Sequence, residues 1–125
     1  MNHLSNRELE YTIIGEMMAD SVRNKGIIMQ LTEDDFSTLY TQQIFAEIKK
    51  IVSAGGEADL VTVCAHLSDK AQKAAVEAAG SNIGSWNIRQ HAKEIKNYTA
   101  KRKIAQTAQA MLQSIHDDSK TPITI

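Results

Sequence analysis

The sequence has 125 residues, which is near the size of one domain and allows a single buried core. Its hydrophobic fraction of 42% and charged fraction of 23% are those of a globular protein, and they exclude a disordered chain. The 14 basic and 15 acidic residues give a formal net charge of -1. Proteins that bind nucleic acid on their own usually carry a positive excess, so we expect weak or no direct DNA binding.

The residue inventory also argues against a catalytic or metal site. The single cysteine, Cys64, excludes an internal disulfide, and the sequence shows no apolar signal peptide and no membrane-length run, so we expect a cytoplasmic protein with no membrane partner. The four histidines lack the paired spacing of a zinc site, and no glycine-rich phosphate loop or Gly-x-Ser-x-Gly elbow occurs. We therefore predict no cofactor, no metal and no enzymatic activity.

The apolar pattern predicts an all-α fold. The only proline is Pro122, and nowhere do four or more residues alternate apolar with polar ones, so no strand is expected. The first helix is predicted over about 6–19, because Ser5 and Glu8 have the spacing of a capping box. Three apolar residues recur on one face of this helix: Leu9, Ile13 and Met17.

Two more helices are predicted before the first glycine pair. Asp20 is expected to cap a short second helix with apolar residues Val22, Ile27 and Ile28. The third follows an acidic turn at 33–35, whose acids we interpret as helix-capping charges and not as an acid–base cluster. Its apolar residues are Leu39, Tyr40, Ile44, Phe45, Ile48, Ile51 and Val52. Gly55 and Gly56 end it, because glycine tolerates the left-handed conformation at a helix C-terminus.

A fourth and a fifth helix complete a predicted head of about five short helices. Asp59 is placed to begin the fourth helix, and Ser68 is placed to begin an alanine-rich fifth helix that ends near Gly80. The core of the head is expected to include Leu9, Ile13, Ile44, Phe45, Ile48, Val63 and Leu67.

A long last helix is predicted from about 85 to 115, and its apolar pattern changes partway. The first part has Ile88, Ala92 and Ile95 on one face. The second part carries the stripe Ile104, Ala108, Met111, Leu112 and Ile115. At about 100° per residue, the step from Ile95 to Ile104 rotates the apolar face by roughly 180°. The first half is therefore expected to pack on the head, and the second half to project and to associate with another copy.

This pattern divides the chain into three parts. We expect a helical head over 1–84, a helix over 85–116 that packs on the head and then serves as a dimerisation arm, and a flexible tail or linker over 117–125. The long helix also contains a concentration of basic residues: Lys93, Lys96, Lys101, Arg102 and Lys103. Such residues contact nucleic acid in some proteins, although they more often form the solvated side of a helix. A small helical DNA-binding protein is therefore one alternative.

A resemblance rests on a series of short motifs in order. These are residues 8–15 (ELEYTIIG), Asp35-Phe36, residues 43–48 (QIFAEI), residues 55–63 (GGEADLVTV), and Asn87-Ile88 with Ala92, Ile95 and Arg102. Together they cover roughly 6–112 and resemble the N-terminal domain of DnaB-type replicative DNA helicases. The chain departs from that pattern at Thr41, where histidine is usual, at Ser37, where an aromatic residue is usual, and at Gly80-Ser81, which replaces a Gly-Gly-x-x-Tyr-Leu segment.

The resemblance implies a non-catalytic module for DNA replication. In this family the domain is a helical head plus a hairpin of two helices, and the hairpins of neighbouring subunits pair to build a collar on the hexameric motor. The resemblance therefore implies self-association, as a dimer or as a hexamer in a full-length helicase, and a collar that docks primase or a helicase loader. ATP hydrolysis belongs to a motor domain that this chain lacks. The chain ends where the second arm of the hairpin is expected. It is therefore either a piece of a longer helicase or a short phage- or plasmid-type replication protein that loads or inhibits a helicase.

Overall fold

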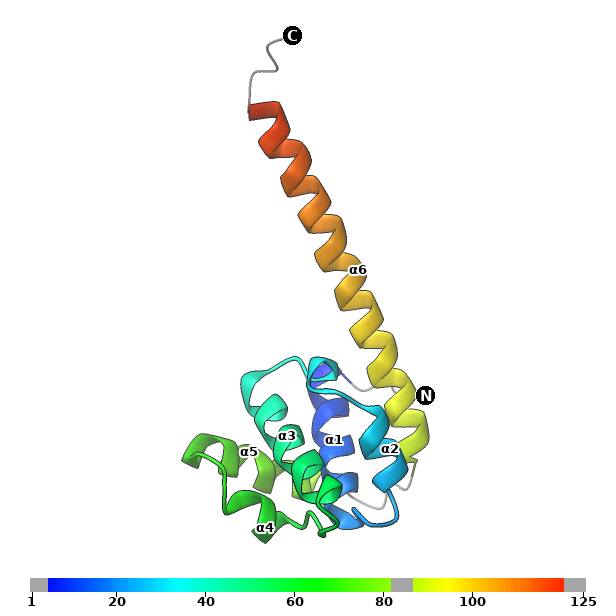
Figure 1. The fold of residues 1–125 in the computed structure, drawn as a ribbon, viewed down its shortest axis with the longest axis vertical. Coiled ribbons are helices and arrows are strands. Elements are labelled where there is room, and N and C mark those ends of the chain that lie inside the picture. Colours follow the sequence, from blue (N-terminus) through cyan, green and yellow to red (C-terminus); the bar gives the residue numbers. More distant parts are fainter. Residues whose placement is uncertain (1–4, 82–86, 121–125) are drawn as a thin grey trace.

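The computed structural model describes residues 5–81 and 87–120, except for the side chains of 116–120. Within these ranges the chain forms six α-helices, one short 3-10 helix and no strand. The elements are α1 (Asn6–Ala19), α2 (Lys25–Gln30), η1 (Glu33–Asp35), α3 (Leu39–Ser53), α4 (Leu60–Cys64), α5 (Asp69–Gly80) and α6 (Ile88–Lys120). The predicted all-helical fold with a long projecting helix is confirmed (Figure 1).

Helix α1 lies at the centre of the head (Figure 1). It begins at the predicted cap, where the Ser5 hydroxyl accepts a hydrogen bond from the Glu8 amide at 3.1 Å. Because α1 contacts α3, α5 and α6, it is buried on several sides. Its buried apolar side chains are Leu9, Ile13, Ile14, Met17 and Met18.

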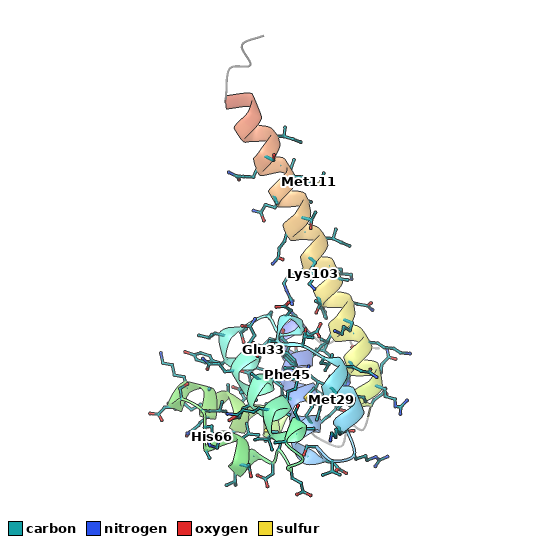
Figure 2. All side chains as sticks on the ribbon, viewed as in Figure 1. Met29, Glu33, Phe45, His66, Lys103 and Met111 are labelled. Atoms are coloured by element: carbon teal, nitrogen blue, oxygen red, sulfur yellow. The ribbon has the colours of Figure 1, made fainter. Side chains whose placement is uncertain are left out.

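The core is largely the one that the sequence predicts. Six of the seven predicted core residues are fully buried, and Leu67 is partly buried. Phe45 lies inside the head (Figure 2) and stacks on Phe36 with 4.7 Å between the ring centroids. Few aromatic residues are available to fill the core, so small side chains that let helices approach closely contribute to it. Helix α5 buries Ala71, Ala74, Ala75 and Ala78.

The predicted caps and stops of α3, α4 and α5 are confirmed. Gly55 has a φ of 88°, in the left-handed region that favours glycine, directly after the end of α3. The Asp59 carboxylate accepts a hydrogen bond from the Thr62 amide at 2.8 Å, and the Ser68 hydroxyl accepts one from the Ala71 amide. These boundaries are set by local chemistry, which the sequence displays directly.

The prediction that Asp20 caps the second helix is wrong. Helix α2 begins only at Lys25, and Asp20 instead accepts a hydrogen bond from the Arg23 amide within a turn. Val22, predicted to be an apolar residue of that helix, is exposed. The cause is a tertiary contact: the buried Ser21 hydroxyl accepts a hydrogen bond from the Ala58 amide at 2.8 Å, which anchors the backbone where a helix was expected to begin.

Helix α6 starts beside the head and continues far beyond it (Figure 1). It extends to Lys120, past the predicted end at Ile115 and into the segment predicted as a tail from 117. No glycine or proline interrupts 116–120, and Pro122 is the first residue that opposes a helix. The predicted boundary between 84 and 85 lies outside the described residues, as does 121–125.

Candidate assembly surface on the projecting helix

The first turns of α6 fasten the long helix to the head. Ile88, Ala92 and Ile95 pack against the core, as the first apolar face predicts, and Thr99 is buried further along the same face. This part of α6 contacts α1, α2 and η1. The helix is therefore held along more than two turns before it leaves the head.

A buried carboxylate reinforces this attachment. Asp35 of η1 is 1% exposed and accepts hydrogen bonds from Lys96 Nζ at 2.7 Å and Thr99 Oγ1 at 2.8 Å, both on α6. It also accepts one from the Thr32 amide at 2.9 Å, which closes the capping box of η1. Arg102 adds a further link by donating a hydrogen bond to the Asp34 carbonyl. The acidic turn, which forms η1, therefore does more than cap a helix, because its residues bind α6 directly.

The surroundings of Asp35 stabilise its ionised form. Burial by itself raises the pKa of Asp35, but the hydrogen bonds from Lys96, the Thr32 amide and Thr99, with the charge of Lys96, lower that pKa below its ordinary value. The carboxylate is therefore charged at neutral pH, and its contacts with α6 are charge-assisted hydrogen bonds.

A second buried acid links α6 to the central helix. Glu16 of α1 lies 2.6 Å from His91 Nδ1 of α6, and both side chains are largely buried. Burial raises the pKa of Glu16, while the hydrogen bond and charge of His91 act in the opposite direction. Because an ionised carboxylate only accepts, His91 Nδ1 is the donor when Glu16 is charged.

A third buried acid explains two departures from the family pattern. Glu10 of α1 is fully buried and accepts hydrogen bonds from the Ser37 amide at 3.0 Å and the Thr41 hydroxyl at 2.8 Å. The Ser37 hydroxyl lies 2.5 Å from its other oxygen. The two residues that differ from the family's usual aromatic and histidine therefore bind the same carboxylate.

Thr41→Val tests this arrangement. The variant keeps the shape of the side chain but removes a hydrogen bond to a buried carboxylate and the hydrogen bond that the Thr41 hydroxyl accepts from the Thr38 amide in the capping box of α3, so the free energy of unfolding is expected to fall by about 1–2 kcal/mol. Thr107→Val, at an exposed position on α6, is the matched control, and at a protein concentration where the chain is monomeric it is expected to change the free energy of unfolding by less than about 0.5 kcal/mol. Equal urea midpoints for both variants and the wild type would show that the Glu10 network contributes no stability.

Beyond the head, α6 has a continuous apolar face. Every described side chain from 103 to 115 is exposed. Ile104, Met111, Leu112 and Ile115 are 62–69% exposed, and with Ala108 they form the surface that we call the arm stripe. Figure 2 shows Met111 on the projecting part of the helix, far from the head. The helical spacing brings all five together on one face, roughly opposite the face that packs on the head.

The five basic residues do not form one surface. Lys96 pairs with Asp35 and Arg102 with the Asp34 carbonyl, so both point toward the head. Lys93, Lys101 and Lys103 are exposed. Since successive residues turn by about 100°, Lys101, Arg102 and Lys103 point in three different directions.

Within 5–81 and 87–120, no group of three or more His, Cys, Asp or Glu side chains could hold a metal ion. No helix in the same part of the chain combines the length and the apolar character needed to cross a membrane.

The comparison with protein families gives the identity of the fold. A family model described as the DnaB-like helicase N terminal domain matches residues 2–97. The chain belongs to this family. The match includes the first turns of α6, and it ends before the arm stripe. This domain is the non-catalytic part of DnaB helicases, and the motor domain lies outside the matched region.

Two known proteins are also similar to this chain. The replicative DNA helicase DnaB of Buchnera aphidicola subsp. Baizongia pistaciae (strain Bp) is 29% identical over 117 residues, which cover 88% of this chain. The chain spans 25% of the length of that relative. A solved structure of the N-terminal domain of DnaB helicase from Helicobacter pylori matches with a TM-score of 0.78 at 18% identity, over 93% of this chain and 99% of that one. That domain was described together with its interactions with primase.

Proposed function

We propose that this chain is the assembly and partner-docking module of a replicative DNA helicase, acting in the cytoplasm. Copies associate through the arm stripe, and the head docks primase or a helicase loader. In this proposal the head extends to 84 and the arm over 85–116. Unwinding and ATP hydrolysis are assigned to a motor domain elsewhere in the helicase.

The observation that carries the proposal is the exposed arm stripe. Burying one Leu, Ile or Met side chain contributes roughly 1.5–3 kcal/mol, so the four large residues of the stripe favour a partner surface. Another copy of α6 supplies a surface of matching length and chemistry. A two-fold pair is the arrangement that we favour, because closed symmetric dimers are the commonest small assemblies.

Two features support a docking role for the head. It is held together by buried carboxylate networks and a single core, so it is a rigid platform for a partner. The Helicobacter pylori domain that shares this fold was described with primase. The resemblance in fold makes primase the partner to test first.

Sedimentation of a stripe variant tests self-association. We expect Leu112→Asp with Ile115→Asp to abolish association, because two charges on each chain would have to be buried in the paired stripe. The folded monomer is expected to survive, since both side chains lie beyond the head. The measurement is the sedimentation coefficient over a range from micromolar to millimolar protein.

A matched variant controls for added charge on the helix. Gln106→Asp with Gln113→Asp adds the same two charges to exposed positions on the opposite face of α6, and it is expected to associate like the wild type. If the wild type, the stripe variant and this control all sediment as identical folded monomers over the whole range, association through the arm stripe is wrong.

A further inference from the structure

A groove lies on the head between α2 and the first turns of α6, away from the arm stripe. It encloses about 890 Å³, within the size range of sites that hold a compact ligand. Its apolar lining residues are Ile27, Leu31, Ile88 and Ala92. Leu31 and Ile88 are themselves buried in the core, so the packing of the head fixes the lining.

The groove has an excess of positive charge. Arg89, Lys93 and Lys96 line it from α6, where steps of four and three residues place them on one helix face, and Arg23 lines it from the turn before α2. Lys96 is paired with Asp35. The other three are exposed, and within the described part of the chain none of them forms an ion pair with a carboxylate.

The acids that line the groove already have partners. Glu16 is bonded to His91, and Asp20 accepts a hydrogen bond from the Arg23 amide. These hydrogen bonds do not remove the negative charge of a carboxylate, but the four basic lining residues outnumber the two acidic ones, so the groove keeps an excess of positive charge. An apolar lining with an excess of cations matches a ligand that presents both apolar side chains and carboxylates.

We propose that this groove binds an acidic amphipathic helix of a partner protein. Its apolar side chains enter between α2 and α6, and its carboxylates pair with Arg23, Arg89 and Lys93. This is the general mode in which a helix lays its apolar face into a groove. The proposal deepens the docking role of the head and rests on it.

A nucleic acid fits this groove less well than an acidic helix. A phosphate backbone gains affinity from many cations, and it makes no use of the partly exposed apolar surface of Ile27 and Ala92.

Fluorescence anisotropy with a labelled synthetic peptide tests the proposal. The peptide is a helix of about four turns with leucines on one face and glutamates on the other. We expect saturable binding to the wild-type chain, and binding about tenfold or more weaker to Arg89→Glu with Lys93→Glu. Lys70→Glu with Lys73→Glu reverses two exposed charges on α5 outside the groove, and it is expected to change the affinity by less than about twofold.

Two further probes identify the chemistry that is recognised. A peptide with serines in place of leucines is expected to bind much more weakly, and single-stranded oligodeoxythymidine is expected not to compete. The proposal is overturned by absence of saturable peptide binding, by equal binding of the serine peptide, by equal losses in the two charge-reversal variants, or by oligodeoxythymidine that binds more tightly and depends on Arg89 and Lys93.

The same variants separate this proposal from self-association. Arg89 and Lys93 lie on the attached part of α6, so their reversal is expected to leave the sedimentation behaviour unchanged. Leu112→Asp with Ile115→Asp is expected to leave peptide binding unchanged. Loss of self-association in the groove variant, or loss of peptide binding in the stripe variant, would show that the surface concerned was assigned wrongly.

Discussion

Ile95→Ala is expected to lower the free energy of unfolding by about 3–4 kcal/mol. Ile95 is fully buried where α6 meets the core, and removing its outer carbons loses apolar burial and leaves a cavity that the surrounding helices fill only in part. The measurement is chemical unfolding in urea, followed by far-ultraviolet circular dichroism. Because α6 is fastened to the head near this residue, the variant should also expose the first turns of α6 to hydrogen exchange.

The same substitution on the other face of the same helix is the control. Ile104 is 69% exposed, so Ile104→Ala is expected to change the stability of the monomer by less than about 0.5 kcal/mol. Its effect should appear in self-association, because Ile104 belongs to the arm stripe. Equal stability losses for the two variants at a concentration where the chain is monomeric would contradict the division of α6 into an attached part and a projecting part.

The helix boundaries that the sequence predicted correctly depend on local interactions. Ser5, Asp59 and Ser68 each accept a hydrogen bond from an amide three residues later, and Gly55 takes the backbone conformation that a helix stop requires. Spacing along the chain is sufficient to recognise such features. The rotation of the apolar face along α6 was also visible, because it depends only on the geometry of a helix.

The failed boundary at α2 has a non-local cause. The hydrogen bond between the Ser21 hydroxyl and the Ala58 amide joins residues that are far apart in the sequence, and no spacing rule reports it. An aspartate at position 20 can accept a hydrogen bond at the start of a helix or within a turn, so its identity alone does not distinguish the two structures. The hydrogen bond between Ser21 and Ala58 favours the turn.

The buried carboxylates were missed for a related reason. Acidic residues are rarely buried unless they are paired, and the partners of Glu10, Glu16 and Asp35 lie on other elements. One signal was available for α1: Glu10 lies next to Leu9, and Glu16 next to Met17, within a helix that has apolar residues on several sides, so both acids were candidates for burial. The basic face of the groove was missed because Arg89 lies apart from the concentration of lysines, although the helix places it beside Lys93.

Asp35→Asn is expected to lower the free energy of unfolding at neutral pH by about 2–3 kcal/mol. The side-chain amide of asparagine is uncharged, so its hydrogen bonds with Lys96 and Thr99 are weaker than those of the carboxylate. Its nitrogen is itself a donor and would face the donors that bind Asp35. Lys96 is 47% exposed and can turn to solvent, which keeps the loss below that of a fully buried pair. Ser5→Ala, at the exposed N-cap of α1, is expected to alter stability by less.

The effect of pH separates the charge of Asp35 from its shape. Its pKa is lowered in the folded protein, so the stability that it contributes is present above its unfolded pKa and is lost as the pH falls through its folded pKa. The difference in unfolding free energy between the wild type and Asp35→Asn should therefore be constant near neutral pH and narrow as the solution becomes more acidic than the ordinary aspartate pKa of about 3.9. Urea titrations at a series of pH values measure this difference. If the difference in unfolding free energy between the wild type and Asp35→Asn stays constant into strong acid, the variant acts by disturbing packing. The ionised form of Asp35 then does not fasten α6 to the head.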